Sequence, residues 1–326
     1  MTFGPKVVVT GAAGFIGMHL CAQLKQAGYE VIGIDNLHTS YGGNLAKFRQ
    51  KQLEEGGIEI RLIDLADEAK IPEVAGIFHG AKSVIHLAAW PGVKNGESMR
   101  AEYARANLTG FSNVLTAINL SRPGSFLFAS SSSIYGDLGV GGPVKESVAD
   151  GRALKSFYAT TKWSNEVTAR EFHEKHGIPS LALRFFTVYG EFGRPDMAYW
   201  IFLEQLLASD PVTLYGSTGG RRVFTYVLDA CDRVIRLMEQ ISDGFDAFNV
   251  ASGSSITTLQ MLETLSKMIG VTPKIEFQGR ADFDVAATWA DLTKLESKIG
   301  PRPMTDLATG LQNFVDWYLG YRNRII

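Results

Sequence analysis

The chain has 326 residues, of which 45% are hydrophobic and 20% are charged, and its 32 basic and 34 acidic side chains leave a formal net charge of −2. This length favours one large α/β unit with an appended lobe over a string of small modules. The near-neutral charge offers no basic surface for nucleic acid or an anionic membrane, and no apolar run reaches the ~18 residues that a membrane span needs.

Short apolar segments alternate with helical segments through the first half of the chain. Lys6–Thr10 is rich in β-branched residues, and Phe15–Ala27 carries apolar residues at helical spacing before it ends at Gly28. The cycle then repeats through four further apolar segments: Glu30–Asp35, Ile58–Asp64, Ser83–Leu87 and Ser125–Ser130. Strands that alternate with crossover helices predict a parallel sheet with helices on both faces, which is the Rossmann-type doubly wound α/β fold.

The second half begins with a predicted long helix, Phe157–His176, and a strand, Pro179–Phe185. Beyond Phe186 the regular alternation of strands and helices fails, and the chain is rich in Gly, Pro and Arg up to Arg222. Later elements are expected at about Thr225–Gln240 and Ala247–Val250, both returning to the first sheet, and as helices near Thr258–Ile269, Asp291–Ile299 and Asp306–Tyr321. The chain is therefore predicted to form two interleaved domains, 1–186 with about 224–250, and a smaller α/β lobe of 187–223 with 251–326.

The two cysteines, Cys21 and Cys231, lie in predicted helices, and neither has a second Cys or His at ligand spacing. We expect both to be buried apolar thiols and predict no metal site. The first six residues lead directly into a strand without the basic and apolar regions of a signal peptide. A soluble protein of the reducing cytoplasm is expected.

A glycine-rich loop, Gly11-Ala-Ala-Gly14-Phe-Ile-Gly17, joins the first strand to the first helix. Glycines there let the backbone approach a pyrophosphate at the helix N-terminus. The spacing is not the commoner Gly-x-Gly-x-x-Gly, and alone it also fits a plain tight turn. Asp35 closes the second strand, where a carboxylate accepts hydrogen bonds from the adenosine ribose and repels the extra phosphate of NADP. We therefore predict NAD as the cofactor, bound by Gly11, Ala13, Gly14, Phe15, Ile16, Gly17, Asp35 and Asn36.

Asp64 and Leu65 close the third predicted strand. Asp64 either receives the adenine amino group or caps the following helix. Both interpretations are kept, and both residues are included in the predicted cofactor site.

Tyr158-Ala-Thr-Thr-Lys162 places a phenol and an ammonium group four residues apart, on one face of a helix. A tyrosine with its usual pKa near ~10 is a poor base at neutral pH, but a neighbouring cation and a positive nicotinamide ring both favour the phenolate. Alone, such a pair is most often a solvated helix face. Downstream of a dinucleotide loop it predicts that Tyr158 is a proton acceptor.

Together these motifs resemble the extended short-chain dehydrogenase/reductase family, specifically the NAD-dependent sugar-nucleotide epimerases and dehydratases. The resemblance spans nearly the whole chain, over Gly11–Gly17, Asp35–Asn36, His86–Ala89, Asn107–Gly110, Ser130–Gly136, Tyr158–Lys162 and Arg184–Gly190. It implies that Tyr158 is the general base, that Lys162 binds the nicotinamide ribose and tunes Tyr158, and that Ser131 bridges the sugar hydroxyl to Tyr158. It also implies that the cofactor is lined by Leu87, Ala88, Ala89 and Asn107.

The resemblance further implies a reaction and an assembly. Tyr158 takes the proton of the sugar 4-hydroxyl while C4 gives a hydride to NAD, and the 4-keto sugar turns over and takes the hydride back on its other face. Family members form homodimers, which here implies a four-helix interface from the helices near Glu102–Ser121 and Phe157–His176.

The residues after Ser131 and at the end of the second strand indicate which branches of the family this chain does not resemble. Dehydratases carry an Asp-Glu pair directly after the catalytic hydroxyl residue, whereas Ser132 and Ser133 follow Ser131 here. Reductive members use NADPH and carry a basic residue near the end of the second strand, where this chain has Asp35 and Asn36. Both branches are therefore disfavoured.

The segment Arg184–Tyr199 closely resembles the UDP-glucuronate 4-epimerases. In that group the equivalents of Thr187 and Arg194 hold the sugar carboxylate together with the hydroxyls at Ser131, Ser132 and Ser133, and an arginine fork fixes both the position and the plane of a carboxylate. The resemblance also assigns Tyr199 to the substrate site. The plane matters because a 4-keto uronate is a β-keto acid that loses carbon dioxide when its carboxylate bond aligns with the carbonyl orbitals. Alternatively, Arg194 pairs with Asp196 on a surface loop.

The nucleotide end of the substrate is expected in the smaller lobe. Gly219–Tyr226 resembles the family's diphosphate-binding turn, with Arg222 at the matching position and Arg280 as a second cation. The match is imperfect, since Val223 and Leu228 stand where relatives often carry acids. Asp282 or Asp284 is expected to hold the uridine ribose, and Lys94 stands where uronate relatives usually carry Arg, so that it would act as a point charge.

The leading hypothesis is an NAD-dependent 4-epimerase that converts UDP-glucuronate to UDP-galacturonate, with no nucleic-acid or membrane partner. The alternatives are a UDP-glucose or UDP-N-acetylglucosamine 4-epimerase, a UDP-glucuronate decarboxylase, and a non-catalytic nucleotide-binding scaffold. Intact Ser131, Tyr158 and Lys162 weigh against the scaffold.

Overall fold

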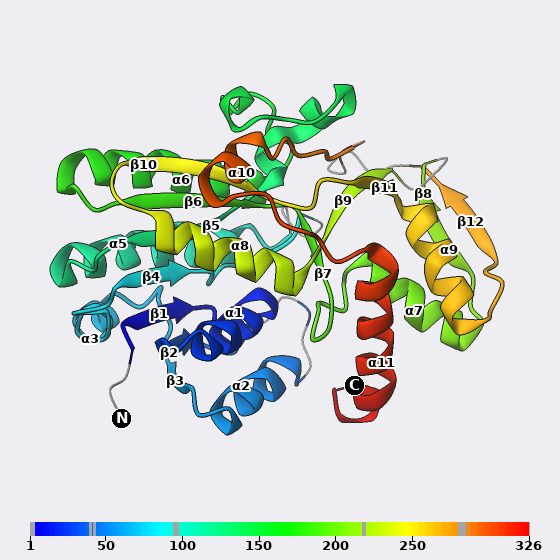
Figure 1. Cartoon of the computed structure of the whole chain (residues 1–326), viewed down its shortest axis with the longest axis horizontal. Coiled ribbons are helices and arrows are strands. Elements are labelled where there is room, and N and C mark those ends of the chain that lie inside the picture. Colours follow the sequence, from blue (N-terminus) through cyan, green and yellow to red (C-terminus); the bar gives the residue numbers. More distant parts are fainter. Residues whose placement is uncertain are drawn as a thin grey trace.

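The computed structural model describes residues 4–38, 41, 44–93, 98–216, 220–279, 285 and 287–325. Its main feature is a seven-stranded sheet in the order β10-β6-β5-β4-β1-β2-β3 (Figure 1). The strands are β1 (Lys6–Thr10), β2 (Glu30–Asp35), β3 (Glu59–Leu62), β4 (Ser83–His86), β5 (Phe126–Ser131), β6 (Ser180–Phe185) and β10 (Phe245–Val250). All neighbouring pairs are parallel. The predicted doubly wound fold is confirmed, and β10 returns to the sheet edge as expected.

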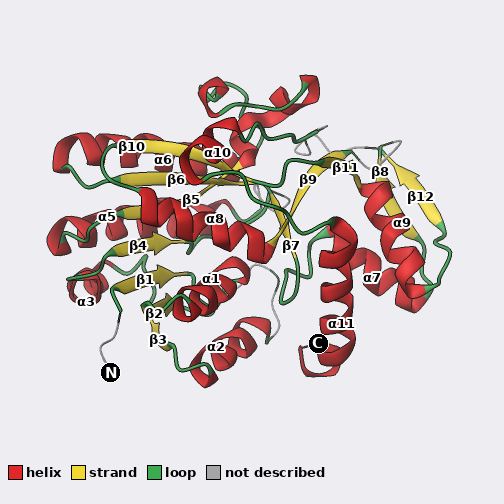
Figure 2. Ribbon diagram, in the orientation of Figure 1, coloured by secondary structure: helices red, strands yellow, loops and turns green. Residues whose placement is uncertain are grey.

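Helices cover both faces of this sheet (Figure 2), because alternate side chains of each strand point to opposite faces. Val7 and Val9 of β1 join a core cluster that includes α1 and α8 residues, whereas Val8 joins a second cluster with α3, α5 and α6. The helices of this domain are α1 (Phe15–Gln26), α2 (Leu45–Glu55), α3 (Ile71–Phe78), α4 (Arg100–Ala104), α5 (Gly110–Ser121), α6 (Phe157–His176) and α8 (Val227–Gln240). Helix α10 (Thr293–Ile299), from the segment predicted to belong to the smaller lobe, also packs on α8 and β10. The two cysteines are buried in α1 and α8, as predicted.

The strand order reverses at β1, which pairs with β2 on one side and β4 on the other. Ligands of open α/β sheets bind at the carboxyl ends of the strands beside such a reversal. The glycine-rich loop follows β1, and the strand end that follows β4 carries Leu87 to Ala89. The topology therefore brings these two predicted segments to one place.

The smaller lobe lies beside the carboxyl ends of the sheet (Figure 1). It contains the sheet β11-β9-β7 and the pair β12-β8. Its strands are β7 (Thr187–Tyr189), β8 (Val212–Tyr215), β9 (Arg221–Tyr226), β11 (Ser255–Thr257) and β12 (Ile275–Gln278), and its helices are α7 (Ala198–Ala208), α9 (Thr258–Ile269) and α11 (Leu307–Ile325). No helix in the described part of the chain is long and apolar enough to span a membrane.

The stretch from Phe186 to Arg222, in which the regular alternation fails, contains β7, α7 and β8, which the sequence did not indicate. Helix α7 reads AYWIFLEQLLA, and Trp200, Phe202 and Leu203 are buried on neighbouring positions. Such a helix has little polar face, so its sequence lacks the 3.6-residue periodicity that marks an amphipathic helix. Packing within the lobe stabilises it.

Candidate active site

A cavity of about 460 Å³ lies at the carboxyl ends of the central strands and is lined by residues of both the large sheet and the smaller lobe. Most predicted site residues line it, although they come from distant parts of the chain. They are Gly11, Ala13, Gly14, Phe15, Ile16, Gly17, Asp35, Asn36, Asp64, Leu65, Leu87, Ala88, Ala89, Ser131, Ser132, Ser133, Tyr158, Lys162, Thr187, Arg194 and Arg222.

The glycine-rich loop is shaped for close backbone approach. Gly11 has a φ of +70°, and a β-carbon there would lie 2.6 Å from the Ala88 nitrogen. A β-carbon at Gly17 would lie 2.0 Å from the Gly11 carbonyl oxygen. Helix α1 begins directly after Gly14, which caps it without a side-chain hydrogen bond. The first N–H groups of α1 therefore remain for an anion, as a dinucleotide pyrophosphate requires.

Asp35 stands at the end of β2 and braces this loop. Its carboxylate accepts hydrogen bonds from the backbone nitrogens of Ala13, at 2.9 Å, and Leu37, at 2.7 Å. Burial raises the pKa of Asp35, while these two hydrogen bonds and the charge of Arg49 oppose that rise. Its place beside the loop fits the recognition of a ribose hydroxyl pair.

Asp64 is not a helix cap, since the 3-10 helix that follows is capped by Asp67. Asp64 accepts hydrogen bonds from the Ala66 nitrogen, at 3.0 Å, and from Arg105, at 2.6 Å. Burial raises the pKa of Asp64, but the hydrogen bonds from Arg105 and Ala66 outweigh this effect and lower it. Asp64 lines the cavity, and its contact with the adenine amino group stays a prediction.

Tyr158 and Lys162 lie one turn apart near the start of α6, whose N-cap is Ser156. The Lys162 ammonium donates to the Ala129 carbonyl at 2.9 Å and lies 5.9 Å from the centre of the Tyr158 ring. Burial lowers the pKa of Lys162 to about 8. Burial also raises the pKa of Tyr158, although a hydrogen bond with Ser131 and the charge of Arg194 act in the opposite direction. The protein alone therefore keeps this phenol protonated at neutral pH.

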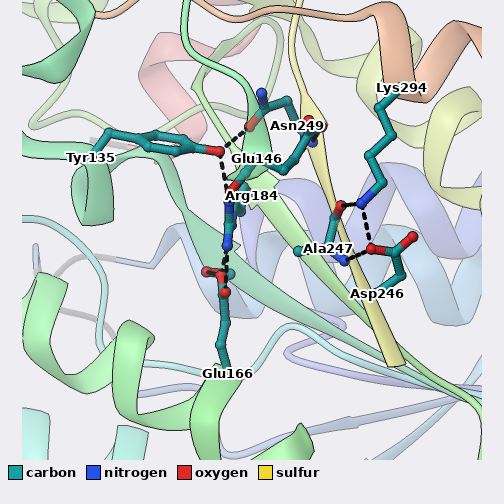
Figure 3. A network of polar contacts seen from close by, with 9 residues as sticks. Tyr135, Glu146, Glu166, Arg184, Asp246, Ala247, Asn249 and Lys294 are labelled. Carbon is teal, nitrogen blue, oxygen red and sulfur yellow. Dashed lines mark hydrogen bonds and ion pairs between the residues drawn. The ribbon is translucent and has the colours of Figure 1, made fainter. Parts of the chain in front are cut away.

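A buried polar network fixes the strand that carries Ser131 against the helix that carries Tyr158 (Figure 3). Glu166, on α6, forms two hydrogen bonds with Arg184, on β6, at 2.9 and 2.7 Å, and also accepts one from Ser130. Arg184 donates to the Tyr135 hydroxyl at 2.8 Å, and that hydroxyl donates to Asn249 at 2.6 Å. Buried ion pairs hold their geometry when every polar group has a partner. Three strands and α6 are thereby locked beneath the cavity.

Arg194 lies in the cavity wall with only 17% of its side chain exposed. Its Nε and Nη2 donate to the two carboxylate oxygens of Asp196 at 3.0 and 2.6 Å. The alternative pairing with Asp196 is thus present, but the pair lines the cavity instead of lying on a surface loop. Gly92 adjoins it, because a β-carbon there would lie 3.0 Å from Nη2 of Arg194.

Two predicted contact residues stand behind the cavity wall. Asn107 is 1% exposed, in a π-helical turn (Arg105–Thr109), and its amide hydrogen-bonds the backbone N–H and C=O of Trp90 and the Thr161 hydroxyl. Tyr199 is fully buried, and a β-carbon at Gly193 would lie 1.9 Å from its hydroxyl. Neither lines the cavity as expected, and both instead support the segments that do.

Arg222 lines the lobe side of the cavity and donates to the Val285 carbonyl at 2.7 Å. The other residues expected at the nucleotide end of the substrate, Lys94, Arg280, Asp282 and Asp284, lie outside the described residues. In the described part of the chain, no group of three or more His, Cys, Asp or Glu side chains could hold a metal ion.

The sequence interpretation missed several cavity residues, among them Tyr103, Trp90 and Lys155. The Tyr103 hydroxyl donates to the Gly92 carbonyl at 2.7 Å, and its ring stands edge-on to Tyr158 with centroids 6.1 Å apart. These residues belong to none of the quoted motifs, and only the proximity of Tyr103 to Asn107 along the helix hinted at its place.

His19 supports the segment before Arg194 and predicts a pH dependence of stability. Its Nε2 lies 2.9 Å from the Glu191 carbonyl oxygen, and burial lowers its pKa to about 4. The unfolded chain binds this proton near pH ~6.5, so stability contributed by neutral His19 is full above that value and is lost as the pH falls toward 4. Between pH 7 and 5 we expect a loss on the order of 1–2 kcal/mol from this residue.

Urea unfolding at pH 7 and pH 5 measures this loss. His19→Gln keeps a donor for the Glu191 carbonyl without the titration, so its two midpoints should lie closer together than those of the parent. Some pH dependence remains, because burial also lowers the pKa of His86, to about 3. Equal midpoint shifts in parent and variant would contradict the prediction.

Comparisons with known proteins agree with this geometry. A model of the NAD dependent epimerase/dehydratase family matches residues 7–251. UDP-glucuronate 4-epimerase 3 of Arabidopsis thaliana is 34% identical over 98% of this chain and 78% of its own length. The crystal structure of UDP-glucuronic acid 4-epimerase from Bacillus cereus, in complex with UDP-glucuronic acid and NAD, has a TM-score of 0.89 at 29% identity, covering 97% of this chain and 99% of that one. The UDP-glucose 4-epimerase of Thermus thermophilus, in complex with NAD, has a TM-score of 0.86 at 27% identity, covering 97% and 99%.

Proposed function

The chain belongs to the NAD dependent epimerase/dehydratase family, and we propose that within it the protein is a 4-epimerase that interconverts UDP-glucuronate and UDP-galacturonate. One observation carries the choice of substrate: the Arg194 guanidinium lines the same cavity as Tyr158, Thr187 and the serines at 131–133. A cation in one cavity with four hydroxyl side chains, those of Thr187 and the three serines, suits a sugar carboxylate next to the reacting carbon. The named relatives with the same activity support this choice.

Tyr158 is proposed as the group that takes the proton of the sugar 4-hydroxyl and returns it. When bound, NAD would supply the hydride acceptor for C4, and its positive nicotinamide ring would favour the phenolate. Lys162 holds the nicotinamide ribose while its ammonium stabilises the phenolate charge. Ser131, within hydrogen-bonding reach of Tyr158, relays the sugar hydroxyl to the phenol.

Arg194, Thr187 and the serines at 131–133 are proposed to hold the carboxylate throughout the reaction. The 4-keto sugar is a β-keto acid, and it keeps its carboxylate only if that group stays out of line with the carbonyl orbitals. Nε and Nη2 of Arg194 bind Asp196 in the structure, so the proposed contact requires the guanidinium to leave Asp196 or to use its other edge, Nη1 and Nη2. A two-point guanidinium contact sets the plane of a carboxylate in a way that a lysine cannot. Epimerisation without loss of carbon dioxide therefore depends on the orientation of Arg194.

The remaining assignments concern the nucleotide. Arg222, with Arg280, is proposed to neutralise the diphosphate, Asp282 or Asp284 to hold the uridine ribose, and Lys94 to approach the substrate as a point charge. Residues 1–186 with about 224–250 form the proposed NAD-binding domain, and 187–223 with 251–326 form the proposed nucleotide-sugar lobe. Strand β9 leads directly into α8, which packs on α1, and this continuity supports the proposal of interleaved domains.

A cytoplasmic homodimer is also proposed. The interface would use α5 and α6, which expose the apolar residues Leu120 and Val167, at 62% and 54%. Two such helices from each subunit would form a four-helix contact. The reducing cytoplasm suits the two cysteines, which are buried and unbridged.

Asp35→Asn tests the proposed basis of NAD selection. The amide keeps one acceptor oxygen for the ribose but removes the negative charge that repels the extra phosphate of NADP. We expect the ratio of the dissociation constants for NADP and NAD to fall by about 10-fold or more. Titration calorimetry with both nucleotides measures the ratio, and Asp67→Asn, which alters only the cap of a 3-10 helix, is the control. An unchanged ratio in Asp35→Asn would exclude Asp35 as the selecting residue.

A proton NMR time course of UDP-glucuronate with the purified protein tests the function itself. Signals of UDP-galacturonate are expected. A pentose product would identify a decarboxylase, and no reaction with UDP-glucuronate but turnover of UDP-glucose or UDP-N-acetylglucosamine would identify a neutral-sugar epimerase. No turnover of any of these in NAD-loaded protein would identify a nucleotide-binding scaffold.

A further inference from the structure

A buried arginine outside the cavity connects its two halves. Arg49, on α2, is 0% exposed. Its Nε and Nη2 donate to the Phe192 carbonyl at 3.0 and 2.6 Å, and Nη2 also donates to the Gly193 carbonyl at 2.8 Å. On the other side, Nη1 donates to the Tyr41 hydroxyl at 2.7 Å and lies 3.4 Å from the Ala13 carbonyl oxygen. One guanidinium thus contacts both the glycine-rich loop and the segment that ends at Arg194.

That segment, residues 190–194, is here called the clamp loop. Phe192 adopts a φ of +55°, a left-handed conformation that is unfavourable for a bulky residue and persists only where the surroundings impose it. Its ring packs on Trp317 of α11, with centroids 4.8 Å apart, and on Phe48 of α2, at 5.9 Å. The clamp loop is therefore a strained turn held from several elements, and Arg49 binds the two carbonyls just before Arg194.

The charge of Arg49 has no carboxylate within 4 Å among the residues that the structure describes. The charge of Arg49 acts on the Asp35 carboxylate, whose pKa it lowers, but its direct contacts are to carbonyl and hydroxyl oxygens. A buried cation held mainly by such dipoles is unfavourable compared with an apolar side chain of similar size, so stability gives only a weak reason for an arginine here. The place of the charge gives a stronger one, because it lies beneath a loop that fits a pyrophosphate.

We propose that Arg49 is a positioning residue that ties the clamp loop to the dinucleotide loop, so that NAD binding and the orientation of Arg194 depend on one buried guanidinium. Its fork fixes the carbonyls of Phe192 and Gly193, and through them the Arg194 backbone. Its positive charge favours the dinucleotide anion above Ala13. The effect on Arg194 rests on the proposed uronate chemistry, whereas the effect on NAD does not.

Two substitutions of Arg49 separate the effect of its branched hydrogen bonding from the effect of its positive charge. Arg49→Lys keeps a cation but cannot bridge both sets of carbonyls, so the ratio of pentose to UDP-galacturonate is expected to rise by about 10-fold or more while most NAD is retained. Arg49→Met removes the charge as well, and the NAD retained after gel filtration should fall by at least about half. Product NMR gives the ratio, and absorbance of the released nucleotide gives the NAD content.

Arg233→Lys is the matched control. Arg233, on α8, is 3% exposed and also donates to a backbone carbonyl, that of Ala251, but it does not line the cavity or contact either loop. It should lose stability as Arg49→Lys does, without a change in product ratio or NAD content. If Arg49→Lys slows turnover with the parent's product ratio, Arg49 is merely structural and the proposal is overturned.

A measurement without any sugar substrate tests the role of Arg49 independently of the proposed epimerase activity. NAD added to the NAD-free protein should slow backbone amide exchange in residues 190–194 by about 10-fold in the parent and by less than about 3-fold in Arg49→Met. A protein that shows this difference but leaves UDP-glucuronate unchanged disproves the proposed substrate and retains the role of Arg49. Equal slowing in parent and variant, or none in the parent, overturns the coupling.

Discussion

Replacing Tyr158 by phenylalanine is expected to lower turnover by about 10²- to 10⁴-fold, the range that a positioned proton-transfer group contributes. The phenol of Tyr158 interacts with the Ser131 hydroxyl, and the centre of its ring lies 5.9 Å from the Lys162 ammonium. Without the phenol, the 4-hydroxyl must lose its proton to water. The fold should survive, because the ring remains and Lys162 keeps its hydrogen bond to the Ala129 carbonyl.

Rates with UDP-glucuronate, together with the NAD content of the purified protein, check this prediction. Tyr158→Phe should keep its NAD, and KM should change far less than kcat. Tyr29→Phe is the control, since the Tyr29 hydroxyl donates to Glu239 at an exposed position and does not line the cavity. Parent-like turnover in Tyr158→Phe would show that another group takes the proton.

Arg194→Ala is expected to reduce kcat/KM for UDP-glucuronate epimerisation by about 10²- to 10³-fold and to release a pentose product. Truncating one partner of a hydrogen-bonded charge pair costs about 2–5 kcal/mol of binding, and here the lost partner is the guanidinium that contacts the sugar carboxylate. The Asp196 carboxylate, which Arg194 now holds by two hydrogen bonds, would remain unpaired beside the substrate carboxylate. The carboxylates of Asp196 and the substrate would repel each other, so KM for the uronate should rise.

The double variant Arg194→Ala/Asp196→Ala separates the two effects. Removing the second carboxylate should lower KM for UDP-glucuronate again, while pentose is still released because the fork is missing. Steady-state rates and product NMR on both variants measure this. If Arg194→Ala epimerises UDP-glucuronate as well as the parent does, Arg194 does not hold the carboxylate and the uronate assignment loses its main support.

Local sequence signals predicted the elements around the cofactor well. Local residues mark where the β1, α1 and β2 segments begin and end. A β-branched run ends at glycines, and an apolar helix ends at Gly28. Strand β2 matches its predicted bounds, and α6 and α9 match theirs as well. The pairing of β10 with β6 could be inferred because an apolar strand followed a helix of the same repeating pattern. In the smaller lobe, α7 escaped prediction because tertiary packing buries most of its surface.

Most motif residues line the cavity, Tyr158 and Lys162 among them, whereas two do not. Asn107 and Tyr199 belong to matching segments, yet a π-helical turn aims the Asn107 amide at Trp90, and Tyr199 packs beneath Gly193. Arg49, in contrast, contacts the site although no sequence motif indicated it. Helix α2 reads LAKFRQKQLEE, in which one more cation looks like part of a solvated face, and only the three-dimensional arrangement places the clamp loop over it.

The central claim is that one hydrogen leaves C4 of a UDP-uronate and returns to the same carbon from the other face. UDP-glucuronate carrying deuterium at C4, incubated with the purified NAD-loaded protein in ordinary water, tests it most directly. Mass spectrometry and NMR should find UDP-galacturonate that retains the deuterium at C4, with no hydrogen from the solvent. A product with solvent hydrogen at C4, or labelled substrate that remains unchanged, would contradict the account.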